Sequence, residues 1–483
     1  MSIILVIQLF VDREEELRYL EEKFRSKDPE LIVIYGRRRI GKTELIARFI
    51  RGKPAVYFLA DRRPERDLLE EFKGKMSQVL GDGSFSKLEI SGWLEIFKEF
   101  LKWWKGGRAI IVIDEFPMLI EDNKAIPSVF QKIWDLELEN SQVMLILLGS
   151  SVGMMETEVL SYRSPLYGRR TGQWKLQPLR FHHLRGFFKE YSEEDLVRVY
   201  GCLGGVPAYL LKFDPDVPFW DNVATRIFRK GEFLYGEAEF LLRDELREPR
   251  LYSAILKAVA FGASSFGEIA GFTGLEKTLL SKYLDVLEEL GWIERLYPVG
   301  ERIKPRKALY RISDPYMAFW FRYVFPNKSE LELGNVGAVL EKVKRDYDAY
   351  LGTVFEQIFR ESLYGLKRAP FRPKIIGKWW FKDQEIDAVA LDEAQSLSAF
   401  FEVKWSDLKK AEAKRIVQAL KQKAQVFKWR REKRREYFGL VGRRVEGKEE
   451  LSEKGFIIFG LKDILEENSL ARVFRRIWRS DAE

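Results

Sequence analysis

The sequence contains very few of the residues that build covalent cross-links and zinc sites. Its 483 residues include one cysteine, Cys202, and two adjacent histidines, His182 and His183. A single cysteine excludes an internal disulfide framework and zinc sites made of cysteine pairs. Two neighbouring histidines argue against a Ser-His-Asp triad and against multi-histidine metal sites. Any metal is therefore expected to have oxygen ligands, which magnesium and manganese prefer, and a reducing cytoplasm is the expected location.

The sequence also lacks a long hydrophobic run. Because no run of about 18 or more apolar residues occurs, we expect neither a transmembrane helix nor a membrane partner. The apolar start, residues 1–10, is followed at once by charged residues and has no small-residue cleavage site. It therefore favours a first strand over a signal peptide.

The residues that are abundant indicate several folded domains. Hydrophobic residues make up 46% of the chain and charged residues 32%, which is typical of globular proteins, and the length suggests three or four domains. Abundant Lys, Arg and Glu beside few Cys and His resembles the composition of hyperthermophile proteins. The net charge of +8 is modest for this length, so the location of the positive charge matters more than its sum.

Residues 1–180 show the pattern of an α/β domain. Short apolar runs without charged residues alternate with amphipathic stretches such as 43–50 and 93–104. Such runs suit parallel strands buried on both faces, so the expected fold has three layers. Residues 181–250 change to helical spacing and predict a small helical lid. The four expected strands are 31–35, 55–59, 109–113 and 143–148.

A glycine-rich loop follows the first of these strands and precedes the helix expected at 43–50. It reads G-x-x-x-x-G-K-T, and in this setting its backbone N–H groups and the helix N-terminus suit a phosphate chain. We therefore expect a P-loop fold that binds ATP, with Lys42 at the β- and γ-phosphates and the Thr43 hydroxyl on magnesium. The expected nucleotide-binding residues are Gly36, Arg37, Arg38, Arg39, Ile40, Gly41, Lys42, Thr43 and Glu44.

Two acidic residues end a later apolar run, as a P-loop ATPase requires. Asp114 and Glu115 close the strand expected at 109–113. Asp114 is expected to hold the magnesium, and Glu115 to orient and polarise the attacking water.

Polar residues near two further strands complete the expected site. Ser150 or Ser151, at the end of the 143–148 run, is expected to sense the γ-phosphate, and a plain turn is the alternative. Arg169 or Arg170 precedes the last core strand. Either arginine is expected to supply transition-state charge, in cis or to a neighbouring subunit of a homo-oligomer, and a solvated basic turn is the alternative.

Six segments in this order resemble an archaeal ATPase family near the AAA-type and signalling ATPases. The resemblance covers roughly residues 8–245. It implies that Phe10 and Arg13 lie near the nucleotide base and that Gly204–Leu210 lies in the helical lid. The segments are FVDREEEL (10–17), GRRRIGKTEL (36–45), IDEFP (113–117), LLGSS (147–151), SPLYGRR (164–170) and GGVPAYL (204–210).

Residues 251–325 predict a winged helix-turn-helix. Helical patterns at 251–261, 266–272 and 275–290 precede candidate strands at 293–297 and 308–312. Polar and basic residues in the third helix and the wing suit phosphate contact, so DNA is an expected partner. Acidic residues on the same helix leave a protein-docking or structural role open. The contact candidates are Lys277, Thr278, Ser281 and Lys282 on the helix and Arg302, Lys304, Arg306 and Lys307 on the wing.

A hydrophilic linker is expected at 326–344 and a last domain at 345–483. Asp387 lies on one expected strand, and Glu402 and Lys404 share a face of the next. If the two strands pair, both carboxylates converge on one metal, with Lys404 neutralising charge or orienting water. Glu356, on the preceding helix, is a further acidic candidate.

This D-x14-E-x-K pattern resembles the PD-(D/E)XK nuclease superfamily and a C-terminal domain often fused to archaeal ATPases. The resemblance implies an α/β restriction-endonuclease-like fold that uses Mg²⁺ or Mn²⁺, although Ile386 stands where a proline is usual. A solvent-facing E-x-K strand, or a fold that only binds, is the alternative.

The densest basic run lies beyond this pattern, at residues 409–435, and suits a polyanionic substrate, with a solvated helix face as the alternative. We therefore expect an ATPase that acts on DNA, whose ATP state controls a winged-helix contact and a nuclease-like domain. The alternative is an ATP-driven regulatory switch whose last domain is a non-catalytic binding module.

Overall fold

The computed structural model describes residues 10–301 and 307–467. They form two compact units, an N-terminal unit at Phe10–Pro178 and a C-terminal unit that begins at Leu179. Residues 1–9, where a first strand is expected, and the expected wing residues Arg302, Lys304 and Arg306 lie outside the described residues. Within the described part of the chain, no helix is long and apolar enough to cross a membrane.

The N-terminal unit is built around a five-stranded parallel sheet. The strand order is β2-β3-β4-β1-β5, so β1 lies between β4 and β5. β1, β3 and β4 are buried along their whole length, whereas the edge strand β2 is only half-buried. The four expected strands and the α/β fold class are thereby confirmed. The strands are β1 (Glu30–Tyr35), β2 (Ala55–Leu59), β3 (Ala109–Asp114), β4 (Val143–Gly149) and β5 (Gly172–Lys175).

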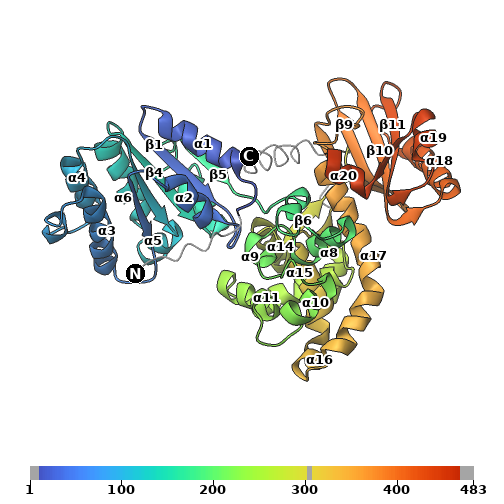
Figure 1. Cartoon of the computed structure of the whole chain (residues 1–483), viewed down its shortest axis with the longest axis horizontal. Helices are drawn as coiled ribbons and strands as arrows, with labels where there is room; N and C mark the ends of the chain where they lie inside the picture. The colour runs from blue at the N-terminus through green and yellow to red at the C-terminus, as the bar shows by residue number, and fades with distance from the viewer. Residues whose placement is uncertain (1–9, 302–306, 468–483) are drawn as a thin grey trace. The chain divides into compact units, whose positions relative to one another are not determined.

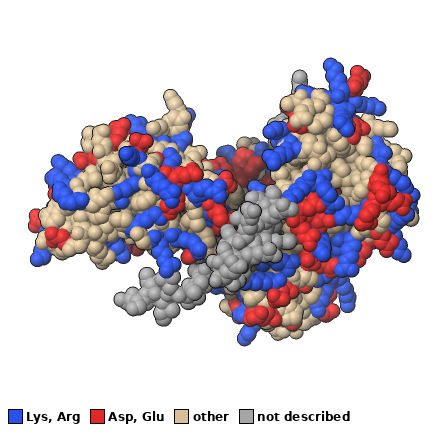
Figure 2. Space-filling model, turned by 45° about the horizontal axis from the view of Figure 1, so that its top comes forward, with Lys and Arg blue, Asp and Glu red and all other residues tan. Residues whose placement is uncertain are grey.

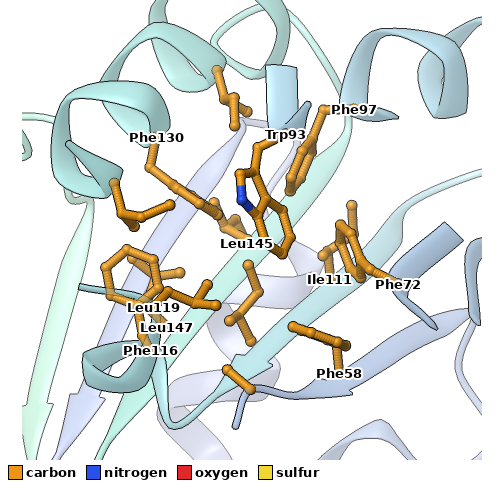
Figure 3. Packing of buried hydrophobic residues seen from close by; sticks show 14 of the residues in the cluster. Phe58, Phe72, Trp93, Phe97, Ile111, Phe116, Leu119, Phe130, Leu145 and Leu147 are labelled. Carbon is orange, nitrogen blue, oxygen red and sulfur yellow. The ribbon is translucent and has the colours of Figure 1, made fainter. Parts of the chain in front are cut away.

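Alternate residues of the sheet face two separate cores. On β1, Leu31 and Val33 belong to a core that α3, α4 and α6 cover, whereas Ile32 and Ile34 belong to a core that α1 and α2 cover. Figure 1 shows α3 and α4 on one side of the sheet and α1 and α2 on the other. Figure 3 shows Trp93 at the centre of the larger core, among the rings of Phe72, Phe97 and Phe130. The helices are α1 (Glu14–Arg25), α2 (Lys42–Ile50), α3 (Glu65–Leu80), α4 (Trp93–Trp103), α5 (Phe116–Asp122) and α6 (Ile126–Ile133).

The C-terminal unit begins with short helices and then a helix–ribbon region (residues 249–312). Its three helices and two antiparallel strands lie where the sequence predicts a winged helix-turn-helix. Ser265 begins the second helix as a capping box with Glu268. The first helices include α8 (Glu193–Leu203), α9 (Pro207–Leu210), α10 (Phe219–Asn222) and α11 (Phe233–Glu245). The helix–ribbon elements are α12 (Pro249–Ala260), α13 (Phe266–Thr273), α14 (Lys277–Glu289), β6 (Ile293–Leu296) and β7 (Leu309–Ile312).

Helices occupy the linker expected at 326–344, and this expectation was wrong. After α15 (Pro315–Phe319), the chain forms α16 (Lys328–Glu332) and then α17 (Val336–Ser362), a helix of 27 residues. Val339, Val343 and Tyr347 are buried at helical spacing, and the Tyr347 ring stacks on Phe219 at 5.8 Å. The hydrophilic residues of this stretch therefore include the exposed face of an amphipathic helix.

α17 continues onto a five-stranded mixed sheet with the order β12-β11-β10-β9-β8. β8, β9 and β10 are antiparallel, and β10, β11 and β12 are parallel. Phe359 of α17 packs on Phe401, whereas Phe427 at the end of α18 packs on Phe400, so the two helices cover opposite faces. The elements are β8 (Ile375–Phe381), β9 (Gln384–Asp392), β10 (Leu397–Leu408), α18 (Lys410–Val426), β11 (Arg435–Val445), α19 (Lys448–Glu453), β12 (Ile457–Gly460) and α20 (Leu461–Glu467).

The turn that follows β6 is built into the core of this mixed sheet. The Val299 N–H donates to the Lys378 carbonyl oxygen at 3.0 Å, and the Val299 side chain belongs to the same buried cluster as Trp379 and Phe427. Gly300 has φ +75°, and a Cβ there would lie 2.6 Å from the Phe427 ring. The helix–ribbon region and the mixed sheet therefore share one hydrophobic core.

The larger core of the N-terminal unit gives a first prediction. Leu145 is fully buried on β4, so Leu145→Ala should lower the free energy of unfolding of this unit by about 2–5 kcal/mol, through lost burial and a residual cavity. Amide hydrogen exchange within β3 and β4 would measure the loss separately from the C-terminal unit. Leu136→Ala is the control, because Leu136 is 67% exposed and its truncation should change the stability little. Equal exchange in both variants would contradict the assigned core.

Candidate functional site

The glycine-rich loop closes tightly between β1 and α2. Gly36 has φ +153°, and a Cβ there would come 2.5 Å from the Leu176 carbonyl oxygen. Gly41, with φ +92°, begins α2 in the left-handed region that favours glycine. The loop can therefore keep this course only with glycine at both ends, as the sequence predicts.

The Lys42 ammonium group lies within this loop. It donates to the carbonyl oxygens of Gly36 at 2.8 Å and Arg37 at 2.9 Å. The N-terminus of α2 and the basic residues Arg37, Arg38 and Arg39 add positive charge around it. A cradle of backbone groups with a lysine inside it fits the phosphate chain of ATP.

Asp114 at the end of β3 is the meeting point of three elements. The Thr43 hydroxyl of α2 donates to Asp114 Oδ2 at 2.9 Å, and the Tyr57 hydroxyl of β2 donates to the same oxygen at 2.5 Å. Burial, and then the hydrogen bond to Asp114, raises the pKa of Tyr57 above its usual value. The structure therefore brings the two expected magnesium ligands, Thr43 and Asp114, together, and these oxygen donors fit magnesium.

Glu115 and Ser150 also meet at this edge of the sheet. Glu115 has φ +54°, so the chain turns sharply after Asp114. The Ser150 hydroxyl donates to one carboxylate oxygen of Glu115, and the Ser150 N–H donates to the other at 3.3 Å. The expected base is therefore in direct contact with Ser150, and the choice of Ser150 or Ser151 as the γ-phosphate sensor stays a prediction.

Arg13 holds the phosphate loop through hydrogen bonds. It is buried, and its Nη2 donates to the carbonyl oxygens of Ile40 at 3.2 Å and Gln177 at 2.7 Å. The resemblance implies a place for Arg13 near the nucleotide base, and the structure adds that it joins the phosphate loop to the segment after β5. Phe10 packs with the α1–α2 core, under the Arg48 guanidinium at 4.6 Å.

The two candidate arginines are held by neighbours in the N-terminal unit. Arg169 forms an ion pair with Asp135, at 3.2 Å. Arg170 donates to the Leu160 carbonyl oxygen at 3.2 Å and lies over the Tyr167 ring. Their transition-state role stays a prediction.

Asp387 and Glu402 lie side by side in the mixed sheet. The β9–β10 ladder ends at the pair Ala388–Phe401, and the two carboxylates follow directly after it. The Lys404 ammonium group lies 3.0 Å from Asp387 Oδ2 and 2.9 Å from Glu402 Oε2. Both carboxylates are almost fully buried. Asp387, Glu402 and Lys404 therefore converge as the sequence predicts.

The surroundings of this pair shift the pKa values of the two carboxyl groups in opposite directions. Burial, and then the charge of Asp387, raises the pKa of Glu402 above its usual value. Burial also opposes ionisation of Asp387, but Lys404 and the Val403 N–H outweigh it and lower the pKa of that carboxyl. Lys423 of α18, which belongs to the basic run that was expected to suit a polyanion, donates to Glu402 Oε1 at 2.7 Å. Two lysines therefore neutralise two carboxylates.

Glu356 is held by cations of its own. It accepts from Arg360 at 3.3 Å and from Lys378 at 3.4 Å, while burial and the charge of Asp387 raise its pKa. Among the described residues, no group of three acidic, histidine or cysteine side chains is arranged to hold a metal ion. The metal set of Glu356, Asp387 and Glu402 is thus not assembled as expected: Lys404 bridges Asp387 and Glu402, whereas Glu356 is paired with Arg360 and Lys378.

The helix–ribbon region exposes part of its candidate DNA-contact surface. Lys277, Thr278, Ser281 and Lys282 are exposed on α14. On the wing, Lys307 is paired with Glu301. In this region, the exposed candidate contact residues therefore lie on α14 and not on the described part of the wing.

The basic run at 409–435 is partly structural. Arg434 is buried, and it donates to the carbonyl oxygens of Phe427 at 2.7 Å and Ala424 at 2.9 Å. Lys410 pairs with Glu450. Figure 2 shows acidic and basic side chains interspersed on the face of the molecule in view.

Comparison with known proteins identifies the family. Residues 10–213 match the family described as an ATPase domain predominantly from Archaea. The chain is 41% identical over 458 residues to the uncharacterised protein MJECL04 of Methanocaldococcus jannaschii, covering 94% of this chain and 100% of that protein. The chain belongs to this archaeal ATPase family. The resemblance of residues 8–245 to an archaeal ATPase family is therefore confirmed.

Further similarities agree with this archaeal ATPase assignment. A solved structure, the Walker-type ATPase PABY2304 of Pyrococcus abyssi, is 25% identical with a TM-score of 0.50, and the match covers 65% of this chain and 96% of that chain. The uncharacterised ATP-binding protein MJ0423 of Methanocaldococcus jannaschii is 51% identical over 47 residues, which are 10% of this chain and 80% of that protein. Residues 320–416 match a family described as Archaea bacterial proteins of unknown function.

A second prediction concerns Tyr57, which the sequence did not mark as a site residue. Tyr57→Phe keeps the ring but removes the hydroxyl that holds Asp114 Oδ2. If Asp114 binds magnesium, this variant should need about tenfold more magnesium for half-maximal ATP hydrolysis, as outer-shell partners of metal ligands typically do. Tyr162→Phe is the control, because Tyr162 is 84% exposed in the same unit. An unchanged magnesium requirement would remove Tyr57 from the site.

Proposed function

We propose that this ATPase-family protein binds ATP with magnesium in the loop from Gly36 to Thr43 and hydrolyses it. The observation that carries the proposal is the Thr43–Asp114 hydrogen bond of 2.9 Å, which joins the phosphate loop to the acidic end of β3. Lys42 would bind the β- and γ-phosphates, and Thr43 and Asp114 would hold the metal. A bound metal ion would neutralise charge on the phosphates. Manganese suits the same oxygen donors as magnesium.

Glu115 is the base in this proposal. Its carboxylate lies one residue beyond Asp114 and is oriented by two hydrogen bonds from Ser150. A carboxylate held in this way can accept a proton from water while Lys42 stabilises the phosphate charge. Ser150 would sense the γ-phosphate through the same contact, since a change at Glu115 must change the Ser150 hydrogen bonds.

We further propose that the C-terminal unit acts on DNA and that the mixed sheet has nuclease activity. Buried Asp387 and Glu402, bridged by Lys404, support metal-assisted phosphodiester hydrolysis. The exposed polar residues of α14 would contact DNA phosphates. Because the helix–ribbon region and the mixed sheet share a core at Val299, a change in one would be transmitted to the other. ATP state would control this C-terminal unit.

One observation favours the alternative, a regulatory switch whose mixed sheet binds without cutting. Glu402 accepts from both Lys404 and Lys423, and Glu356 from both Arg360 and Lys378. These pairings satisfy the buried carboxylates without a metal, as a structural ion-pair network would.

ATP hydrolysis gives a third prediction. Glu115→Gln should lower kcat by roughly 10²–10⁴-fold and preserve ATP binding, because it removes the base but not the phosphate cradle. Lys42→Ala should weaken ATP binding itself. Phosphate release and calorimetric titration would measure the two effects. Glu121→Gln is the control, since that carboxylate pairs with Arg62 at the surface. Normal turnover by Glu115→Gln would assign the base elsewhere.

DNA cleavage gives a fourth prediction. The protein should cut linear, circular or single-stranded DNA in Mg²⁺ or Mn²⁺. Comparing cleavage with and without ATP would show whether the ATP site and the cleavage site are coupled. Asp387→Asn and Glu402→Gln should abolish cutting, because each removes a carboxylate charge from the site. Asp407→Asn, on the same strand but paired with Arg443, should cut normally. Continued ATP hydrolysis without cleavage under any condition would favour the switch.

A further inference from the structure

A cavity of about 570 Å³ lies in the C-terminal unit, beside the Asp387–Glu402 pair, and Glu356 with its partners Arg360 and Lys378 lies on its wall. Its walls come from the end of α12, from β7, from α17 and from the β8–β9 hairpin. These elements are fixed relative to one another, because Val299 joins the ribbon to the core of the mixed sheet. Its volume lies in the range of small-molecule sites, which is about 300–1,000 Å³.

The charge on the cavity wall is predominantly positive. Five basic and three acidic residues line it. Arg311 of β7 and Arg360 of α17 are both among them, and both guanidinium groups are largely buried, with 23% and 13% of their side-chain surface exposed. Burial lowers the pKa of Arg360, and the nearby charge of Arg311 lowers it further. Two buried like charges on one wall are stabilised by an anion between them.

Both guanidinium groups retain donors for such an anion. Arg360 donates to Glu356 and to the Asp387 carbonyl oxygen, and both hydrogen bonds come from Nη1. Arg311 contacts Glu294 through Nε and Nη2. Within the described residues, Nε and Nη2 of Arg360 and Nη1 of Arg311 have no acceptor. Paired guanidinium donors recognise phosphate well, because their planar fork matches two phosphate oxygens.

Aromatic side chains line the same cavity. Tyr350 of α17 and Trp380 of β8 contribute to its wall. Aromatic faces stack on nucleobases of any sequence. The wall thus combines phosphate-binding and base-binding groups, in a volume that suits one nucleotide.

We propose that this cavity binds a nucleoside phosphate, with Arg311 and Arg360 on the phosphate and Tyr350 and Trp380 beside the base. The ligand is a free nucleotide or the phosphorylated end of a single strand, which share this chemistry. Binding of a strand end rests on the proposed action on DNA, whereas binding of a free nucleotide does not. Through Arg360, the cavity is one hydrogen bond from the Asp387 backbone, so an occupied cavity would place a strand end beside the carboxylate pair.

Binding would be measured by calorimetry on the full chain carrying Lys42→Ala, which removes the ATP-site lysine. The two probes are deoxyadenosine 5′-monophosphate and a short single-stranded oligonucleotide with a 5′-phosphate. Arg311→Gln should weaken binding roughly tenfold or more, the loss expected for a charged hydrogen bond. Arg360→Lys, which keeps the charge but loses the fork, should weaken it less. Arg185→Gln is the matched control, because Arg185 pairs with Glu193 elsewhere in the unit.

The two probes separate the sources of the ligand. Binding of the monophosphate supports a free nucleotide, and binding of the phosphorylated oligonucleotide alone supports a strand end. No binding of either probe, or equal binding by Arg311→Gln, would overturn the inference. Asp387→Asn in the same background distinguishes this failure from that of the nuclease proposal, because it should lose cleavage and keep nucleotide binding.

Discussion

Both candidate sites depend on carboxylates that are buried on apolar strands, Asp114 at the end of β3 and Asp387 and Glu402 within β9 and β10. Asp114, Asp387 and Glu402 are each at most 3% exposed, and a buried carboxylate is tolerated only when donors satisfy it. Hydroxyl groups from α2 and β2 serve Asp114, whereas lysines from β10 and α18 serve Glu402. The difference in donors has a consequence. Neutral hydroxyl groups leave the charge of Asp114 available to a cation, whereas lysines neutralise the charge of Glu402.

The C-terminal unit ties its parts together in two places. The N-terminal half of α17 packs on the first helices of the unit, where the Tyr347 hydroxyl donates to the Arg198 carbonyl oxygen, and its C-terminal half packs on the mixed sheet through Phe359. Val299 forms the second tie. A helix of 27 residues, about 40 Å long, resists bending. Movement of the helix–ribbon region relative to the sheet would therefore have to break a hydrophobic core.

The sequence predicts best the features that depend on local pattern. The buried strands, the phosphate loop and the position of Asp114 follow from apolar runs, glycine spacing and strand ends. Tyr57 was missed because its hydroxyl reaches Asp114 from a neighbouring strand, and nothing in the β2 sequence marks that reach. The prediction of a linker at 326–344 was wrong because α17 is amphipathic. The polar residues around the buried Val339 and Val343 made the segment look like a hydrophilic linker. Arg434 was counted as surface charge, although it caps carbonyl oxygens in the core.

The lysines around Glu402 bear on how a metal and a polyanion would act together at the proposed nuclease site. Two lysines and two carboxylates are already balanced, so an added divalent cation would raise the local positive charge. Lys404 is 41% exposed and Lys423 is 29% exposed, so both can turn toward solvent. A phosphate backbone at the surface would attract these lysines outward and free the carboxylates for the cation. Under the proposed function, metal binding and DNA binding would therefore favour each other, whereas a purely structural ion-pair network would show no such linkage.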